Sequence, residues 1–249
     1  MANKTSFLPS ADLATTSTSA TPVKNIVLVH GALADASGFR AVYQILKQQG
    51  FHVSLTSQPL TSRAADIAAV RRVLDLQTGP VILVGHSYGG ALITETGDDP
   101  KVKALVYVAA LQPDAGEAPF ELLTSKPAAS QAVKFTTDGY AYLDPAHYQE
   151  DFAADLPKAD TDFMADSQMF VAVECLQTPV SVAAWHEKPS YAIVSTEDRS
   201  LSPDLQRFMY QRSKSKVTEL TGSHAIYISQ PEAVAAVIVA AAREANQAA

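Results

Sequence analysis

Short apolar runs recur along the chain and alternate with stretches of helical periodicity. Clear examples of the runs are residues 25–30 (NIVLVH), 80–85 (PVILVG) and 190–195 (SYAIVS). Such runs are typical of strands that are buried on both faces of a sheet. Residues 62–77, by contrast, place their apolar side chains at helical spacing on one face. Strands that alternate with helices in this way predict an α/β fold, with a mainly parallel sheet and helices on both of its faces.

The same alternation extends over most of the chain. We expect further strands at residues 51–56, 102–109 and 216–220, and further helices at residues 39–49, from Pro203 and from Pro231. Ser202 suits the position before the helix that starts at Pro203, because its hydroxyl can accept from an N–H of the first turn and because proline has a helical φ.

The alternation breaks between residues 112 and 187, where aromatic residues and prolines are scattered without clean strand runs. Residues 135–142 predict a hairpin with an Asp-Gly pair in its turn, and the rest of this stretch favours helices. The sequence therefore predicts one α/β core, built from residues 25–111 and 188–249, with an insertion at residues 112–187.

Length and composition limit the classes of protein that fit. The chain has 249 residues, 47% of them hydrophobic, which suffices for one large domain with its own core. A net charge of −7 and the lack of basic runs argue against nucleic acid as a partner. No apolar run reaches the ~18 residues that a membrane span needs. The one cysteine, Cys175, stands among apolar residues, which predicts a small buried side chain rather than a nucleophile.

Residues 1–24 differ from the rest of the chain in composition. They are mostly polar, rich in Ser, Thr and Ala, and lack the basic start and apolar centre of a signal peptide. We expect them to form a flexible N-terminal tail. The sequence as it stands indicates a cytoplasmic location, whereas a tail left by a trimmed signal peptide would indicate a periplasmic or secreted protein.

The strongest motif is G-x-S-x-G at residues 85–90 (GHSYGG), between a predicted buried strand and a predicted helix. A turn this tight forces a strained backbone on Ser87, and side chains two residues before and after it would collide, which explains Gly85 and Gly89. The N-terminus of the helix then points at the serine hydroxyl. We interpret Ser87 as a nucleophile raised above the carboxyl edge of the sheet. The alternative is an ordinary glycine-rich turn.

A serine nucleophile needs a base, and the base needs an acid that orients it. In folds with this turn the three residues follow the chain order Ser, acid, His. His224 comes directly after the last predicted strand, so its loop should open at the same sheet edge as the serine. Asp198 follows the strand before that one and is the favoured acid, while its neighbour Glu197 should point away. Asp114, which follows an earlier strand, is the competing candidate.

Acyl transfer also requires backbone N–H groups that bind the developing oxyanion. One of them belongs to the residue after the nucleophile, Tyr88. We expect the second in the loop after the first core strand, residues 30–32 (HGA), where Gly31 lets the backbone turn inward and Ala32 supplies the N–H. A plain strand-to-helix turn is the alternative for this loop.

Together these segments resemble the α/β-hydrolase superfamily. The resemblance rests on residues 30–32, 85–90, 196–199 (TEDR) and 222–224 (GSH). It is nearest to small bacterial esterases similar to plant methyl-salicylate esterases, hydroxynitrile lyases and pyrethroid-type carboxylesterases. The resemblance implies an α/β-hydrolase fold, a lid formed by the insertion, no cofactor, and a catalytic triad of Ser87, His224 and Asp198.

Three positions distinguish between activities within this group. Plant-type hydroxynitrile lyases have a polar residue where this chain has Gly31 and a Lys where it has Ala225, so both positions favour an esterase. Haloalkane dehalogenases have a similar fold but use Asp as the nucleophile, and Ser87 excludes that chemistry.

The resemblance therefore implies a serine carboxylesterase that hydrolyses a small, apolar or aromatic ester through an acyl-enzyme, with this small molecule as its partner. The insertion is rich in aromatic residues, which suggests an apolar pocket. The candidate substrate contacts are Tyr88, Phe120, Phe163 and Trp185. Two alternatives stay open: hydrolysis of a lactone or a C–C bond by the same triad, and a receptor-like protein that binds a ligand and turns it over slowly.

Overall fold

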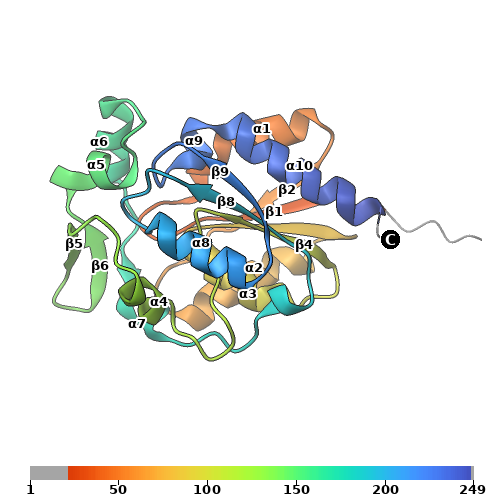
Figure 1. Ribbon diagram of the computed structural model, residues 1–249, viewed down its shortest axis with the longest axis horizontal. Helices are drawn as coiled ribbons and strands as arrows, with labels where there is room; N and C mark the ends of the chain where they lie inside the picture. Colours follow the sequence, from red (N-terminus) through yellow and green to blue (C-terminus); the bar gives the residue numbers. More distant parts are fainter. Residues whose placement is uncertain (1–21, 248–249) are drawn as a thin grey trace, which may run out of the picture.

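The computed structural model describes residues 22–247, whose centre is a six-stranded sheet (Figure 1). Every neighbouring pair of strands in it is parallel, in the order β2-β1-β3-β4-β8-β9. The strands are β1 (Asn25–Val29), β2 (His52–Leu55), β3 (Val81–His86), β4 (Val102–Val108), β8 (Ser190–Ser195) and β9 (Lys216–Leu220). This arrangement confirms the α/β fold that the alternating pattern predicts.

The central strands β1 and β3 are buried along their whole length because helices cover both faces of the sheet, whereas the edge strands β2 and β9 contain polar residues and are partly exposed. In β1, Ile26 and Leu28 belong to one apolar cluster, while Val27 and Val29 belong to the cluster on the other face. Side chains of a strand point alternately to the two faces, so a strand covered on both sides needs an apolar residue at every position.

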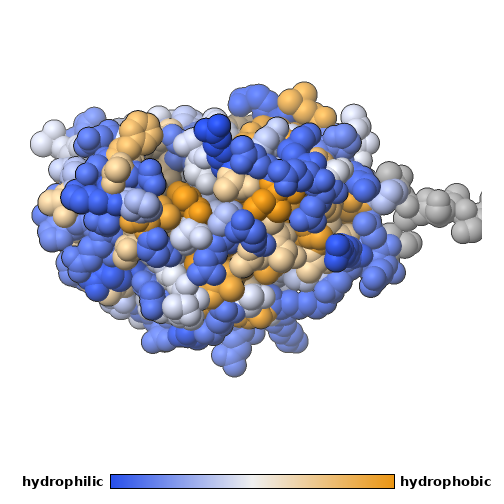
Figure 2. Space-filling view, turned by 90° about the horizontal axis from the view of Figure 1, so that it is seen from above, coloured by the Kyte–Doolittle hydropathy of each residue, from blue (hydrophilic) through white to orange (hydrophobic). Residues whose placement is uncertain are grey.

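The helices form one layer on each face of the sheet. The first layer consists of η1 (Ala36–Phe39), α1 (Arg40–Gln48), α9 (Ile226–Ser229) and α10 (Pro231–Gln247). The second consists of α2 (Arg63–Asp75), α3 (Tyr88–Thr96) and α8 (Pro203–Arg212). Figure 2 looks onto the first layer and shows hydrophilic residues over most of it, with hydrophobic ones in smaller groups between them. Between residues 22 and 247, no helix is long and apolar enough to cross a membrane.

Between β4 and β8 the chain forms a series of short elements, some of which lie at one side of the core in Figure 1. Its helices are α4 (Pro119–Ser125), η2 (Pro145–His147), α5 (Tyr148–Phe152), α6 (Lys158–Asp166), α7 (Val173–Gln177) and η3 (Ala184–His186). Its strands β5 (Val133–Phe135), β6 (Tyr140–Leu143) and β7 (Val171–Ala172) form an antiparallel sheet. The predicted hairpin is present as β5 and β6, and Gly139 takes a φ of +88° in its turn. The third strand, β7, was not expected.

The predicted N-terminal tail lies mostly outside the described residues. Its last part, however, is folded onto the core. Val23 is only 2% exposed, and its N–H donates to Asn246 Oδ1 at 2.5 Å.

Candidate active site

The turn between β3 and α3 holds Ser87 in a strained conformation. Its φ is +53° and its ψ is −124°, a combination that residues with a side chain rarely adopt. A Cβ on Gly85 would lie 2.6 Å from the Gly89 carbonyl oxygen, and one on Gly89 would lie 2.5 Å from the carbonyl oxygen of Val29. Both glycines are therefore required for the close packing of strand, turn and helix, as the motif suggests.

Ser87, His224 and Asp198 form a continuous chain of hydrogen bonds. The Nδ1–H of His224 donates to Asp198 Oδ2 at 2.6 Å, so Nε2 is left to accept from the Ser87 hydroxyl at 2.8 Å. The His224 and Asp198 side chains are 2% and 0% exposed, and Ser87 is half-buried. The three residues follow β3, β8 and β9 at the carboxyl edge of the sheet.

Asp198 is fixed by further donors. Its Oδ1 accepts from the N–H groups of Ser200 at 2.9 Å and Leu201 at 2.7 Å, and its Oδ2 accepts from Gln206 Nε2 at 2.9 Å. Glu197 is exposed, as expected for the residue next to an inward-pointing one. Gln206 belongs to α8, and nothing in the local sequence indicated that it would reach the carboxylate.

Asp114, the competing acid, has other partners. Its Oδ1 accepts from His186 Nε2 at 2.8 Å and from the Ala115 N–H at 2.8 Å. Burial raises the pKa of Asp114, but these hydrogen bonds, with the positive charge of Arg212, hold that pKa below its usual value. The Asp114 carboxylate therefore binds groups near the point where the chain leaves β4. Asp198 is the carboxylate that reaches His224.

The loop after β1 lies against the nucleophile candidate. A Cβ on Gly31 would be 2.6 Å from the Cβ of Ser87, so the loop that contains Ala32 packs against the turn of the serine. The N–H of Ala32 donates to no group in the described part of the chain. The N–H of Tyr88, at the first position of α3, has no acceptor within its helix. Two such N–H groups, one in each of these packed segments, suit the binding of an oxyanion.

Two buried histidines support this loop and the His224 loop. His86 donates its Nε2–H to the His224 carbonyl at 3.0 Å, and His30 donates its Nδ1–H to the Gly31 carbonyl at 2.8 Å. Burial lowers the pKa of His86 well below its usual value, and burial also lowers the pKa of His30. Neither is part of a metal site: within residues 22–247, no three His, Cys, Asp or Glu side chains are grouped as metal ligands would be.

The Tyr88 side chain points into the core. Its hydroxyl donates to Asp66 Oδ2 at 2.9 Å, and Asp66 also accepts from the Leu60 N–H at 2.8 Å and from Cys175 Sγ at 3.5 Å. Cys175 is fully buried, as predicted, and burial raises its pKa to about 12, so the thiol stays protonated. Burial raises the pKa of Asp66 as well. Only the backbone of Tyr88, and not its ring, is directed to the candidate active site.

The other predicted substrate contacts, Phe120, Phe163 and Trp185, have different surroundings. Trp185 donates its indole N–H to the Pro113 carbonyl at 2.8 Å, and its neighbour Ala184 touches the far end of α3, at Gly97. Phe120, on α4, is 42% exposed.

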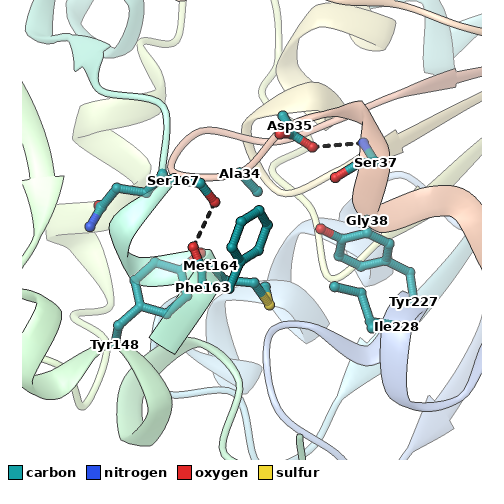
Figure 3. A pocket seen from close by; sticks show the side chains of 11 residues that line it. Ala34, Asp35, Ser37, Gly38, Tyr148, Phe163, Met164, Ser167, Tyr227 and Ile228 are labelled. Carbon is teal, nitrogen blue, oxygen red and sulfur yellow. Dashed lines mark hydrogen bonds between the residues drawn. The ribbon is translucent and has the colours of Figure 1, made fainter. Parts of the chain in front are cut away.

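Phe163 stands at a small pocket of about 90 Å³ where the insertion meets the core (Figure 3). Residues of α6, α9 and the loop after β1 line this pocket, and it does not include the triad. The Tyr148 ring, which also lines it, stacks on Phe152 at 5.0 Å, and the Phe152 ring meets His224 edge-on at 4.9 Å. Phe152 thus connects Tyr148 in the pocket wall to His224.

The family model of the alpha/beta hydrolase family matches residues 26–237. The chain therefore belongs to the α/β-hydrolase family and is a hydrolase.

Several known proteins are similar to it. The carbendazim hydrolyzing esterase of Nocardioides sp. (strain SG-4G) is 34% identical over 113 residues, which cover 40% of this chain and about half (47%) of that protein. The putative methylesterase 14, chloroplastic, of Arabidopsis thaliana is 24% identical, with coverage of 85% of this chain and 70% of the relative.

Solved structures share the fold. A pyrethroid hydrolase from Sphingobium faniae JZ-2 has a TM-score of 0.77 at 24% identity, covering 89% of this chain and 98% of that one. Polyneuridine aldehyde esterase has a TM-score of 0.75 at 19% identity, covering 88% and 98%.

Proposed function

We propose that the protein is a serine carboxylesterase that hydrolyses small, apolar or aromatic esters through an acyl-enzyme. The observation that carries this proposal is the hydrogen-bonded chain from Asp198 through His224 to Ser87, with the serine on a strained turn at the sheet edge. The names of the carbendazim hydrolyzing esterase and of the putative methylesterase support an ester as the substrate class.

In the proposed mechanism, Ser87 Oγ attacks the ester carbonyl while His224 Nε2 takes its proton. Asp198 keeps the imidazole in the tautomer that can accept this proton and stabilises the imidazolium that results. The N–H groups of Ala32 and Tyr88 bind the oxyanion. His224 then protonates the leaving alcohol, and it later activates the water that hydrolyses the acyl-enzyme.

The apolar substrate class is supported by the side chains that the insertion turns toward the core. Leu123, Tyr140 and Met169 are partly buried against the apolar cluster that contains Tyr88, and Leu33 joins them from the loop after β1. We propose that these side chains also form walls of the substrate site, where they would favour apolar acyl or alcohol groups, because burying apolar surface is the main source of affinity at such sites.

Stopped-flow kinetics with p-nitrophenyl acetate, butyrate and benzoate test the proposal. We expect p-nitrophenolate release by the wild type, with none above background for Ser87→Ala. The proposed preference for apolar esters predicts a higher kcat/KM for the benzoate or butyrate ester than for a negatively charged hemiester such as p-nitrophenyl succinate. Binding of these esters without release of product would contradict the esterase and favour a receptor-like protein.

A further inference from the structure

Both residues next to His224 are hydrogen-bonded to the insertion. On one side the carboxylate of Asp155, in the loop between α5 and α6, accepts from the Ser223 N–H at 3.0 Å and from the Ser223 hydroxyl. On the other side the Ala225 N–H donates to the Phe152 carbonyl at 3.0 Å. The backbone that carries the imidazole is thus tied to one short segment of the insertion.

The surroundings of Asp155 are shaped for this contact. Its Oδ2 also accepts from the Ser229 hydroxyl at 2.7 Å, and a Cβ on Gly222 would lie 2.9 Å from the same oxygen. Because Gly222 has no side chain, the Asp155 carboxylate has room at this position. Burial raises the pKa of Asp155, but the hydrogen bonds from Ser223 and Ser229 outweigh it and hold that pKa below its usual value. The group stays ionised at neutral pH, and a charged acceptor makes the stronger hydrogen bonds.

The core holds the same loop by different atoms. The Ser195 hydroxyl, at the end of β8, lies 2.6 Å from the carbonyl oxygens of both Gly222 and Ser223 and shares its proton between them. His86 donates to the carbonyl of His224. The core therefore fixes the carbonyl groups of the loop, whereas the insertion accepts from the N–H groups on either side of His224.

We propose that Asp155 is a positioning residue, which anchors the insertion to Ser223 and Ser229 and thereby holds the His224 imidazole in reach of Ser87. This rests on the proposed function, because it assigns Asp155 to the same proton transfer. That transfer depends on the 2.8 Å contact between Ser87 Oγ and His224 Nε2. A displacement of about 1 Å in such a contact can lower the rate about 10²-fold. The insertion is then a working part of the catalytic apparatus.

Alanine variants test this role. Asp155→Ala should lower kcat about 10- to 100-fold and leave KM within about threefold, because the imidazole loses its alignment while the substrate surface stays. Ser223→Ala should have a smaller effect, and the double variant should lose no more than Asp155→Ala alone, since both act through one contact. The matched control is Asp162→Ala, which removes an exposed carboxylate of the insertion that pairs with Lys158. It should leave kcat unchanged.

Proton NMR adds a readout that does not need turnover. The Nδ1 proton that His224 donates to Asp198 gives a strongly downfield signal, which should shift or broaden in Asp155→Ala and stay in place in Asp162→Ala. If the wild type hydrolyses no ester, the proposed function fails, and the signal still tests the positioning role. If Asp155→Ala does not fold, Ser223→Ala carries the test, with an expected loss in kcat of about threefold or more and the same change of signal. Wild-type kcat together with an unchanged signal in a folded variant would overturn the inference.

Discussion

Gly31 lies against Ser87 so closely that a Cβ on Gly31 would come within 2.6 Å of the serine Cβ. The contact joins the loop after β1, which contains the candidate oxyanion donor Ala32, to the turn after β3. Two motifs that are far apart in the sequence thus form one site because one of them lacks a side chain.

A side chain at position 31 should therefore separate these two loops. We expect Gly31→Ala to lower kcat about 10²-fold, the scale of one lost oxyanion donor, with the fold retained. The control is Gly79→Ala in the turn before β3, where a Cβ would meet only Asn25 Nδ2 at 3.3 Å. Steady-state kinetics and circular dichroism on both variants decide the matter. A folded Gly31→Ala enzyme with wild-type kcat would show that the loop does not serve the oxyanion.

The two candidate acids provide a matched pair. Asp198→Asn should lower kcat by up to ~10⁴-fold with KM largely kept, because the amide cannot hold the required tautomer of His224. Asp114→Asn should have little effect on kcat, since its carboxylate pairs with His186. Kinetics at saturating ester compare the two variants. A large loss of kcat in Asp114→Asn would disprove the assignment of Asp198 as the acid.

Tyr88 is expected to act through its backbone alone. Tyr88→Phe removes the hydroxyl that donates to Asp66 and leaves a buried acceptor with one donor fewer, which should cost about 1–3 kcal/mol in unfolding free energy. The N–H stays in place, so kcat and KM should change less than about threefold. Urea unfolding and kinetics on the same variant separate the two effects, and a large rise in KM would instead indicate that the ring binds substrate.

The two buried histidines predict a loss of stability on mild acidification. The pKa values of His86 and His30 are lowered in the folded state, while the unfolded chain takes up these protons near pH 6.5. Below that pH the unfolded state binds more protons, so the unfolding free energy falls as the pH falls, by up to about 1.4 kcal/mol per pH unit for each histidine. The loss ends where the pH reaches the lowered folded-state values.

Urea unfolding at several pH values between about 7.5 and 5 measures this slope. His86→Gln should remove the contribution of one histidine to the pH dependence of the unfolding free energy. The amide of the glutamine can still donate to the His224 carbonyl. A slope identical to that of the wild type would mean that His86 is not neutral in the folded protein.

The core could be predicted because its signals are local. Each central strand contains a run of apolar residues, and residues 85–90 contain both the end of β3 and the start of α3. The order of the strands at the sheet edge then explains why Ser87, His224 and Asp198 lie together. Strand β7 has no such local signal, because it consists of only two residues, which form a strand through their pairing with β6.

Side-chain direction was harder to predict than backbone position. The motif locates the N–H of Tyr88 but not its hydroxyl, which turns to Asp66. One signal was available: Asp66 lies one helical turn before Val70 on the buried face of α2, where a carboxylate needs donors. Asp155 offered no comparable signal, because its partners Ser223 and Ser229 are brought to it only by the tertiary fold.

The residue that reacts with a fluorophosphonate shows directly which side chain is the nucleophile. The protein is treated with a fluorophosphonate, digested and analysed by mass spectrometry, with Ser87→Ala processed in parallel. We expect one adduct per chain on the peptide that contains Ser87, and no adduct on the variant, because within residues 22–247 the Ser87 hydroxyl is the one that is hydrogen-bonded to His224 Nε2. An adduct on another residue, or equal labelling of Ser87→Ala, would contradict the assignment of Ser87 as the nucleophile.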